Sequence, residues 1–398
     1  MGKGIAIMRQ RLWIVTEVFH PDETATAYIV TRIANKLSEK YNVNVICGPV
    51  SSSGNDDGSL IKDINIYRSN HFNYNKDGIY RRTLRFICIS VILSFKLLWW
   101  SRRNDKVFIT TNPAPLVLFI ALIKCIRHFE LCLLVHDIFP ENVVPAGIIK
   151  SERSLYFRMQ RRLFDWAYTK SDKIVTIGRD MKERVIQKIN NSNSSSQVTV
   201  IPNWADSNMF ISEMMPESTQ LVIQYAGNLG RVQGLMDFLT LFHEAECHNV
   251  VFSIWGSGAI RKELENYCSN IHPDNIMLNG SFSRGQQKDI LRQADICLII
   301  LAEGMYGLGV PSKSYNIMAA GKPVLYIGPK GSEIWRVVED NGIGYCFEPH
   351  DKQAIINFIG HLSVSDREKL AKMGKKAQNL ASKFYTEDIV LSQFMDFV

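Results

Sequence analysis

The chain has 398 residues, of which 46% are hydrophobic and 21% are charged. These proportions are typical of a globular protein with a sizeable core, and they exclude a disordered, collagen-like or many-span membrane chain. A chain of this length is expected to fold into two or three domains. Its eight cysteines are scattered and include no C-x-x-C pair, which favours free thiols in a reducing compartment over a zinc or redox site.

The positive charge is confined to one half of the chain. Residues 1–205 contain 29 Lys and Arg against 17 Asp and Glu, whereas residues 206–398 contain 17 against 22. We therefore expect the two halves to meet different partners, and a basic half fits an anionic membrane surface or a phosphorylated lipid. Nucleic acid is not an expected partner, because the basic half has no aromatic-rich basic motif.

The first half alternates short apolar runs with amphipathic stretches, the pattern of a parallel sheet covered by helices on both faces. Strands are predicted at residues 12–16, 43–47, 108–110, 131–135, 173–176 and 198–201. Helices are predicted at residues 24–40, where Thr24 is the expected cap, and at residues 115–127 and 155–170.

One apolar stretch of the first half, residues 86–100, has two interpretations. A spanning helix needs about 20 apolar residues, and this stretch is shorter and contains Lys96. It is either a buried helix on the sheet or an interfacial helix that lies on a membrane. Tryptophans at its end and flanking cations favour peripheral membrane attachment; these residues are Trp99, Trp100, Arg81, Arg82, Arg85, Arg102 and Arg103.

The alternation restarts after the polar residues 202–204. Strands are predicted at residues 221–225, 250–255, 276–278, 296–301 and 324–327, and helices at residues 235–245, 262–268, 287–294 and 313–320. We expect two α/β domains, residues 1–205 and 206–380, with a hinge near residues 202–210. A last helix, residues 381–398, is expected to cross back to the first domain. The cleft between the domains is the expected ligand site.

Three glycine-rich turns of the second half suit a ligand that carries phosphate. They read YAGNLGRVQG at residues 225–234, WGSGAIRK at 255–262 and YGLGVP at 306–311. Glycines allow the backbone to approach a ligand closely, and a helix N-terminus offers free N–H groups to an anion. Arg231 and Lys313 add cations, Ser312 can cap the helix after the third turn, and Asn316 can bond a sugar hydroxyl. Each turn alone could equally be a structural corner.

The first half contributes one candidate pair to the same cleft. His136 and Asp137 follow a predicted strand, and the tips of parallel strands are where cleft residues gather. The alternative is a structural helix cap beside a histidine that is satisfied within the core.

The motifs, taken in order, resemble the family 4 glycosyltransferases, which have the GT-B fold: α/β, with two Rossmann-like domains facing across a cleft. The resemblance rests on VHDIFPENVV at residues 135–144, VIPNWAD at 200–206, YAGNLGRVQGL at 225–235, LNGSFSR at 278–284 and VPSKSYNIMAAGKPVL at 310–325. The segments NLGRVQG and PSKSYNIMAAGKP resemble in particular the L-fucosamine transferases of O-antigen, capsule and colanic acid synthesis.

The resemblance implies a retaining hexosyltransferase that needs no metal or other cofactor. It would move a sugar, such as N-acetyl-L-fucosamine, from a UDP-sugar to a polyprenyl-diphosphate-linked acceptor at the inner face of the bacterial plasma membrane. The donor residues implied are Gly227, Asn228, Gly230, Gly256, Gly258, Ser281, Phe282, Ser312 and Asn316. The catalytic residues implied are Arg231, Lys313, His136 and Asp137.

The chain departs from the family pattern at three positions. Two family glutamates, eight residues apart, are replaced by Leu308 and Asn316, and Gln233 stands where the family usually has Lys. Two alternatives therefore stay open. One is a nucleotide-sugar epimerase of the same fold, and the other is a non-catalytic assembly protein that binds a nucleotide sugar.

Overall fold

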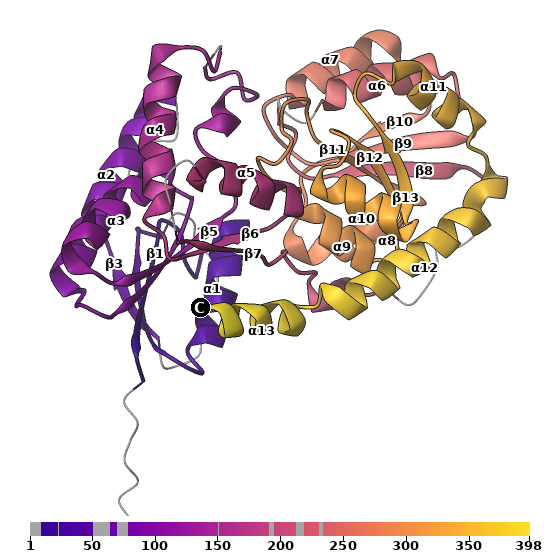
Figure 1. Ribbon diagram of the computed structural model, residues 1–398. Helices are drawn as coiled ribbons and strands as arrows, with labels where there is room; N and C mark the ends of the chain where they lie inside the picture. The colour runs from indigo at the N-terminus through magenta and orange to yellow at the C-terminus, as the bar shows by residue number, and fades with distance from the viewer. Residues whose placement is uncertain are drawn as a thin grey trace, which may run out of the picture.

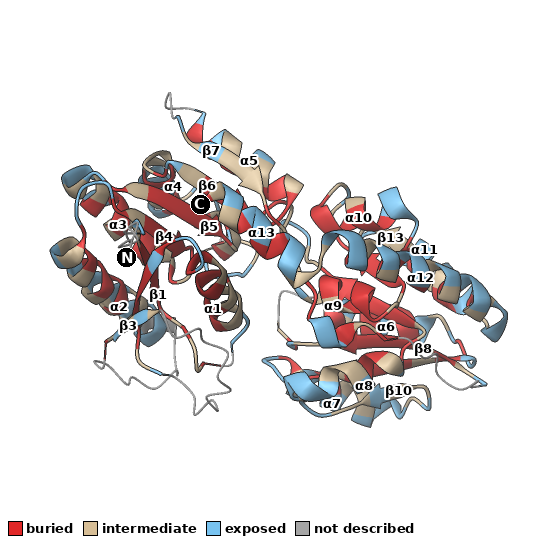
Figure 2. Cartoon of the chain, turned by 90° about the horizontal axis from the view of Figure 1, so that it is seen from below, coloured by how far each residue is buried: buried red, intermediate tan, exposed pale blue. Residues whose placement is uncertain are grey.

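The computed structural model describes residues 9–22, 24–50, 64–69, 79–149, 151–190, 195–211, 219–230 and 234–398. They form two α/β domains, each built on its own parallel sheet (Figure 1). In both sheets the strands are buried at the centre and the helices carry the exposed residues (Figure 2). The two-domain α/β architecture expected from the alternating pattern is therefore confirmed.

The first sheet has seven parallel strands in the order β3-β2-β1-β4-β5-β6-β7. The strands are β1 (Arg11–Thr16), β2 (Asn42–Cys47), β3 (Asn65–Arg68), β4 (Lys106–Thr110), β5 (Glu130–Val135), β6 (Lys173–Thr176) and β7 (Gln197–Val200). The helices of this domain are α1 (Ala25–Leu37), α2 (Ile79–Trp100), α3 (Ala114–Arg127), α4 (Leu155–Thr169) and α5 (Arg179–Ile189). The Thr24 side chain caps α1 by accepting the N–H of Ala27, as its residue type predicts.

The second sheet has six parallel strands in the order β10-β9-β8-β11-β12-β13. The strands are β8 (Leu221–Ala226), β9 (Val250–Trp255), β10 (Ile276–Leu278), β11 (Ile296–Ile300), β12 (Val324–Ile327) and β13 (Gly344–Phe347). Its helices are α6 (Leu235–Glu244), α7 (Arg261–Ile271), α8 (Gln287–Arg292), α9 (Lys313–Ala319), α10 (Glu333–Asn341), α11 (Lys352–His361) and α12 (Arg367–Phe384). Short 3-10 turns lie at Glu141–Val143, Ser207–Met209, Arg284–Gln286 and Val364–Asp366. Parallel neighbours need a crossover, which places the carboxyl ends of all strands of a sheet at one edge.

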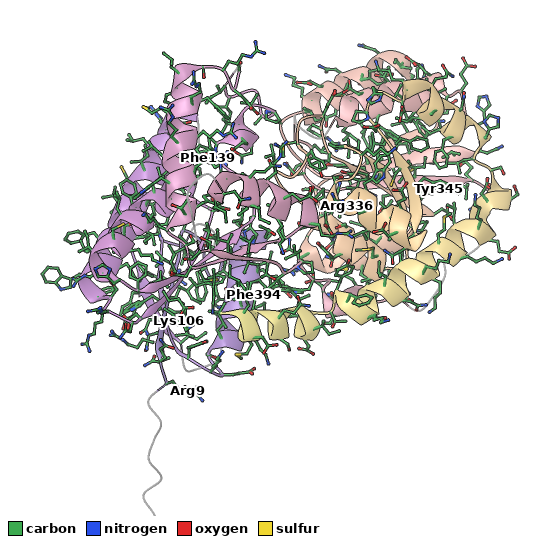
Figure 3. All side chains as sticks on the ribbon, viewed as in Figure 1. Arg9, Lys106, Phe139, Arg336, Tyr345 and Phe394 are labelled. Carbon is green, nitrogen blue, oxygen red and sulfur yellow. The ribbon has the colours of Figure 1, made fainter. Side chains whose placement is uncertain are left out.

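The last helix, α13 (Glu387–Phe397), lies on the first domain beside α1 (Figure 1). Phe394 points into that domain (Figure 3), where its ring lies 6.3 Å from the ring of Phe108. The expected start at residue 381 differs from the structure, because α12 continues to Phe384 and the chain turns at Tyr385. At this turn Ala205 N–H donates to the Tyr385 carbonyl at 2.8 Å, so the two segments that join the domains run side by side.

Candidate functional site

The turns after β8 and β9 are packed backbone against backbone. Gly227 N–H donates to the Trp255 carbonyl at 3.0 Å. A Cβ atom at Gly256 would lie 1.9 Å from the Gly227 carbonyl oxygen, and one at Gly258 would lie 2.4 Å from that of Leu229. Both glycines have positive φ, at 141° and 157°. No other residue fits there, so the two turns form one wall of bare backbone, which we call the glycine wall (residues 227–230 and 256–258).

Lys313, the first residue of α9, places its ammonium group against this wall. Its Nζ lies 3.5 Å from the centre of the Tyr225 ring, and a Cβ atom added to Gly227 would lie 3.9 Å from it. The Nζ atom is buried and has no hydrogen-bond partner, and burial lowers the pKa of this amine to about 7. A buried ammonium without an acceptor is costly. An anion bound beside Lys313 would remove that cost. The second expected cation, Arg231, lies outside the described residues.

The other residues expected at the donor lie around the same wall. Asn228 and Ser281 are exposed, while Gly230 and Phe282 are half-buried. The turn after β10 joins the wall because Gly256 N–H donates to the Gly280 carbonyl at 3.0 Å. Three neighbouring strands of the sheet thus present their turns together, as the strand order β10-β9-β8 requires.

The structure does not match two of the roles expected at α9, those of Ser312 and Asn316. Ser312 occupies the N-cap position but makes no side-chain capping bond, because its backbone is helical rather than extended. Asn316 accepts the N–H of Asp206 at 2.9 Å and donates to Gln287 at 3.1 Å. Its amide is therefore engaged at the hinge and does not stand free for a sugar hydroxyl.

Leu308, at the other family glutamate position, is part of the first domain's core. Its side chain is only 4% exposed, and its carbonyl accepts the N–H of Ile138 at 3.1 Å. The apolar side chain explains how this residue of the second domain can be buried in the first, where a carboxylate would be costly.

His136 and Asp137 stand at the carboxyl end of β5 and face the second domain. Their backbone N–H groups both donate to the Thr111 hydroxyl, at 3.1 and 3.3 Å. The Nε2 atom of His136 is buried without a partner, and burial lowers the pKa of its ring to about 4, so the ring is neutral at pH 7. The Asp137 carboxylate approaches Gly309 so closely that a Cβ atom on that glycine would lie 3.2 Å from Oδ1.

Asp137 is open to solvent, yet the surrounding protein raises the pKa of its carboxyl by desolvation. Both observations fit a carboxylate that has protein on several sides and water on one. The fold therefore brings the pair His136–Asp137 to the turn that leads into Lys313.

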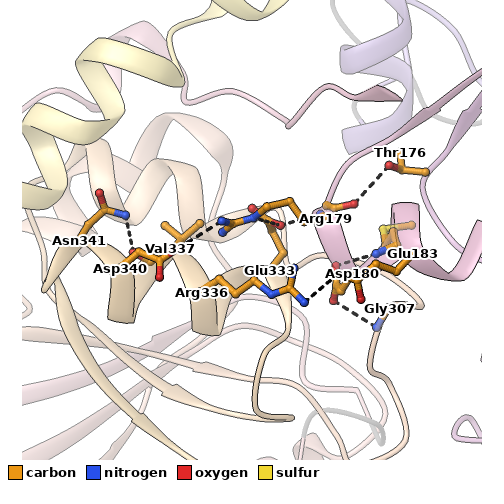
Figure 4. Close-up of polar contacts among 12 residues, drawn as sticks. Thr176, Arg179, Asp180, Glu183, Gly307, Glu333, Arg336, Val337, Asp340 and Asn341 are labelled. Atoms are coloured by element: carbon orange, nitrogen blue, oxygen red, sulfur yellow. Dashed lines mark hydrogen bonds and ion pairs between the residues drawn. The ribbon is translucent and has the colours of Figure 1, made fainter. Parts of the chain in front are cut away.

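The two domains are held together by polar contacts that the sequence analysis did not find (Figure 4). The buried carboxylate of Asp180, on α5, accepts the N–H of Gly307 at 3.2 Å. Arg179 donates to Glu333, on α10, at 3.0 Å through its side chain and at 2.6 Å through its backbone N–H. Each contact joins residues more than 120 positions apart.

Glu183, one turn further along α5, adds to these contacts. We call the whole set, made by Arg179, Asp180 and Glu183 with the second domain, the interdomain latch. It accepts hydrogen bonds from the Tyr306 hydroxyl and from Arg336, both at 3.0 Å. The third glycine turn, residues 306–311, is thus fixed from both domains. Its sequence signal was its glycines, and the sequence analysis predicted no helix at the residues of α5.

The residues expected to face a membrane separate into two groups. Arg81, Arg82, Arg102 and Arg103 are exposed and Trp99 is 74% exposed. Two others turn inward and correct the expectation: Arg85 donates to the buried carboxylate of Glu17 at 2.5 Å, and Trp100 stacks on Trp13 with ring centres 6.1 Å apart. Consecutive helical residues point about 100° apart, so Trp99 and Trp100 cannot share one face.

Among the described residues, α2 is the one helix long and apolar enough to cross a membrane. It nevertheless packs on the first sheet through Ile89, Leu93 and Leu97, which are at most 5% exposed. Within the same described ranges, no three His, Cys, Asp or Glu side chains come together as a metal site.

Comparison with known proteins agrees with this architecture. The model of Glycosyltransferase Family 4 matches residues 26–208, and the model of Glycosyl transferases group 1 matches residues 211–380. The probable glycosyltransferase WbjE of Pseudomonas aeruginosa is 31% identical over 395 residues, which cover 96% of each chain.

Solved structures extend the comparison to the fold. The Anabaena protein Alr3699/HepE, in complex with UDP, is 14% identical with a TM-score of 0.70 over 97% of this chain and 98% of its own. WaaG, a glycosyltransferase involved in lipopolysaccharide biosynthesis, is 11% identical with a TM-score of 0.66 over 97% of this chain and 99% of its own. These likenesses support the GT-B fold expected from the motifs. With both halves matched by glycosyltransferase families and a full-length relative among them, the chain belongs to the glycosyltransferases of the GT-B fold.

Proposed function

We propose that this glycosyltransferase moves a sugar from a UDP-sugar to a polyprenyl-diphosphate-linked oligosaccharide in the synthesis of a bacterial surface polysaccharide. The observation that carries the donor half is the buried, unpartnered ammonium of Lys313 beside the glycine wall. A diphosphate fits both features, because it can approach bare backbone closely and supplies the missing anion. HepE, which shares the fold, was solved with UDP and with UDP-glucose.

In this proposal the protein stabilises the leaving diphosphate by fixed charge. Negative charge grows on the diphosphate as the glycosidic bond breaks, and Lys313 lies where that charge would develop. Arg231 would add a second cation, so the transfer would need no metal or other cofactor. The sugar would keep its anomeric configuration, as in the family that the motifs resemble.

His136 and Asp137 would meet the sugar and the acceptor from the first domain. The neutral ring of His136 has a buried nitrogen without a partner, so it can exchange a hydrogen bond with a sugar hydroxyl. Asp137 stands beside the turn that leads to Lys313. The latch between the domains would keep water away from the donor during transfer.

The proposal also specifies the donor sugar and the location of the protein in the cell. N-acetyl-L-fucosamine is the proposed donor sugar, because the motifs around Gly230 and Lys313 resemble those of L-fucosamine transferases. The proposed place is the cytoplasmic face of the plasma membrane, where the exposed Arg81, Arg82, Arg102, Arg103 and Trp99 would meet anionic lipid.

The test is release of UDP from a panel of UDP-sugars by the purified protein, with and without lipid extracted from bacterial membranes. Release that requires one UDP-sugar and the lipid fraction supports a lipid-directed transferase. Conversion of one UDP-sugar into another without lipid would establish the epimerase instead. Tight UDP binding with no turnover under any condition would leave the non-catalytic binding protein.

A further inference from the structure

A buried ammonium group lies at the last turn of α5, where three elements of the first domain meet. The side chain of Lys188 is only 3% exposed, and its Nζ donates to both carboxylate oxygens of Glu141, at 2.7 and 2.9 Å. The same Nζ lies 2.7 Å from Oδ1 of Asp165, on α4. Arg161 lies 3.6 Å from Glu141 and 3.8 Å from Asp165, so two positive charges face two negative ones. We call these four residues the Lys188 cluster.

A lysine is seldom buried to this extent unless it is paired. A buried ion pair is a poor source of stability, because desolvation offsets most of the attraction. It does fix the position of its carboxylate, since moving one partner away leaves an uncompensated charge inside the protein. The Lys188 cluster therefore holds Glu141 in one place on the loop after β5, residues 136–144, which we call the β5 loop.

The β5 loop begins with the candidate pair of the first domain and is held from three sides. The Ile138 N–H donates to the Leu308 carbonyl of the second domain at 3.1 Å. The Phe139 ring lies 4.6 Å from the Phe164 ring of α4. The third contact, that of Glu141 in the Lys188 cluster, connects the loop to α5, the helix that carries the interdomain latch.

These contacts close a ring that runs through both domains. The third glycine turn binds the first turn of α5, where the Gly307 N–H donates to Asp180 at 3.2 Å (Figure 4). From there the helix spans about 12 Å to Lys188, at 1.5 Å per residue. The ring continues through Glu141 into the β5 loop and returns to the third glycine turn at Leu308. A change at Lys188 would therefore open this ring.

Tyr168 shows that the Lys188 cluster is within electrostatic reach of Asp137. The centre of its ring lies 5.5 Å from the Lys188 Nζ. Burial raises the pKa of its hydroxyl, and the carboxylates of Glu141, Asp137 and Asp165 raise that pKa further. One buried tyrosine thus lies near both the cluster and the candidate carboxylate of the site.

We propose that Lys188 is a positioning residue for sugar transfer, which through Glu141 fixes the β5 loop so that Asp137 faces the third glycine turn. The proposal rests on the proposed function, because it assigns Lys188 to the transfer step. It also extends that function to a side chain that is buried and contacts no reacting group.

The main variant is Lys188→Met, which keeps the length of the side chain and removes the charge that binds Glu141. With the UDP-sugar and lipid that support UDP release, kcat should fall at least about tenfold, because displacing a reacting group by about 1 Å costs about a hundredfold in rate. The donor KM and the dissociation constant of UDP should change less than about twofold, since both depend mainly on the second domain. Lys188→Arg should restore much of kcat, because a guanidinium also binds both oxygens of a carboxylate.

A double variant separates positioning from stability. Lys188→Met leaves the carboxylate of Glu141 buried without a cation, so its melting temperature should fall. Lys188→Met/Glu141→Gln removes both charges, while Asp165 keeps Arg161 as a partner, so most of the melting temperature should return. Its kcat should stay low, because the loop is no longer tied to α5. Recovery of kcat together with the melting temperature would show that the cluster only stabilises the fold, and would overturn the proposal.

The matched control is Lys106→Met. Lys106 begins β4 at the other edge of the first sheet, is 13% exposed and pairs with Glu130 at 2.9 Å. This variant also loses a largely buried lysine that is paired with a carboxylate. Its melting temperature should fall, but kcat of the folded protein should equal that of the wild type.

Hydrogen exchange of the β5 loop gives a readout that needs no substrate. The N–H groups of Asn142 and Val143 donate to carbonyls within the loop, at 3.0 and 3.1 Å, and are protected while the loop is ordered. Lys188→Met should speed their exchange, whereas Lys106→Met should not. Unchanged exchange in Lys188→Met would overturn the proposal. Faster exchange in that variant, with no transfer by the wild type from any donor, would contradict the proposed function and keep Lys188 as the residue that holds the loop.

Discussion

At the scale of single residues, Lys313 is a group that the fold holds at a cost. Its ammonium is buried, stacks on Tyr225 and has no acceptor. The face of an aromatic ring offsets part of the desolvation of a cation, and the Tyr225 ring is itself fixed by the bond from its hydroxyl to the Asn228 carbonyl at 2.8 Å. Unfavourable groups that persist in a fold are most often those that meet a ligand.

Replacing Lys313 should therefore separate binding from stability. Lys313→Met keeps the length of the side chain and removes the buried charge, so we expect a higher melting temperature without ligand. The same variant should bind UDP at least about tenfold more weakly, because a charge-assisted hydrogen bond is lost. Calorimetry with UDP and thermal melts measure the two effects. Unchanged UDP affinity would remove Lys313 from the donor site.

The charge on Lys313 also sets an expected pH dependence. Its pKa is near 10.5 in an unfolded chain and about 7 in the fold. The unfolded chain thus binds more protons between pH 7 and pH 10, so the stability of the wild type should rise with pH across this window relative to Lys313→Met. Below pH 7 both states are protonated, and the difference should be constant.

UDP affinity should follow the opposite trend, because the diphosphate binds the charged amine. Between pH 7.5 and pH 9 the affinity of the wild type should fall, approaching tenfold per pH unit well above 7. Lys313→Arg, which stays charged, should show no such fall. A flat profile in the wild type would mean that Lys313 keeps its charge without UDP.

Several residues that the sequence pointed to lie close together in the structure, but their contacts differ from those expected. Gly227, Gly256 and Lys313 come together because they follow β8, β9 and β11, which are neighbours in the sheet. The alternating pattern predicts a parallel sheet, whose strands end at one edge, but not the order of those strands. Asn316 was expected to face a sugar, but its amide bonds Asp206, a residue 110 positions away. Such a partner depends on how the hinge segment packs against α9, which no local pattern records.

At the scale of elements, α2 shows how one helix can have two apolar sides with different consequences. Its inner side packs on the sheet through Ile89, Leu93 and Leu97. Its outer side carries exposed apolar residues, among them Leu84, Phe95 and Trp99. The sequence offered a buried helix and an interfacial helix as alternatives, and the structure combines the burial of the first with an apolar outer side open to solvent.

The adjacent tryptophans at the end of α2 test this division. Trp100→Ser should lower the melting temperature by several degrees, because it opens a cavity beside Trp13 and Tyr67. Trp99→Ser removes a side chain that is 74% exposed and should leave the melting temperature within about one degree. Equal effects of the two substitutions would contradict the orientation of the helix.

Strands were easier to predict than helices. The buried strands β1, β5 and β11 are continuous apolar runs, as expected for parallel strands covered on both faces. The edge strand β3 reads NIYR with half its residues exposed, and such a short polar run gives no periodic signal. Helix α5 is rich in charge, because its polar side contacts the second domain rather than water alone.

At the scale of the whole molecule, the latch of α5 against α10 and the third glycine turn holds the domains together. Its contacts combine a buried carboxylate, Asp180, with partly exposed ion pairs. Exposed pairs contribute little individually, so most of the attachment between the domains comes from the buried Asp180 and from Leu308, which is buried in the first domain's core.

Weakening the latch should shift the molecule toward open forms. Arg179→Ala removes the side-chain bonds to Glu333 and Asp340, and we expect a larger radius of gyration by X-ray scattering and faster proteolysis near residues 202–210. Lys372→Ala, which removes an exposed pair within α12, serves as the control. Scattering profiles that coincide for both variants would show that the latch does not hold the domains.

Because α13 packs back on the first domain, it limits where related genes can recombine and still encode a folded protein. Arg32 on α1 pairs with Glu387, and Lys40 bonds the Met395 carbonyl at 3.0 Å, so the first and last helices are fitted to each other. Exchange of the donor half between related genes therefore needs two breakpoints, near Ala205 and Thr386. A single breakpoint would join α13 of one parent to α1 of another. The second domain is in this sense an insert within the first, and recombination would be expected to move it as a cassette.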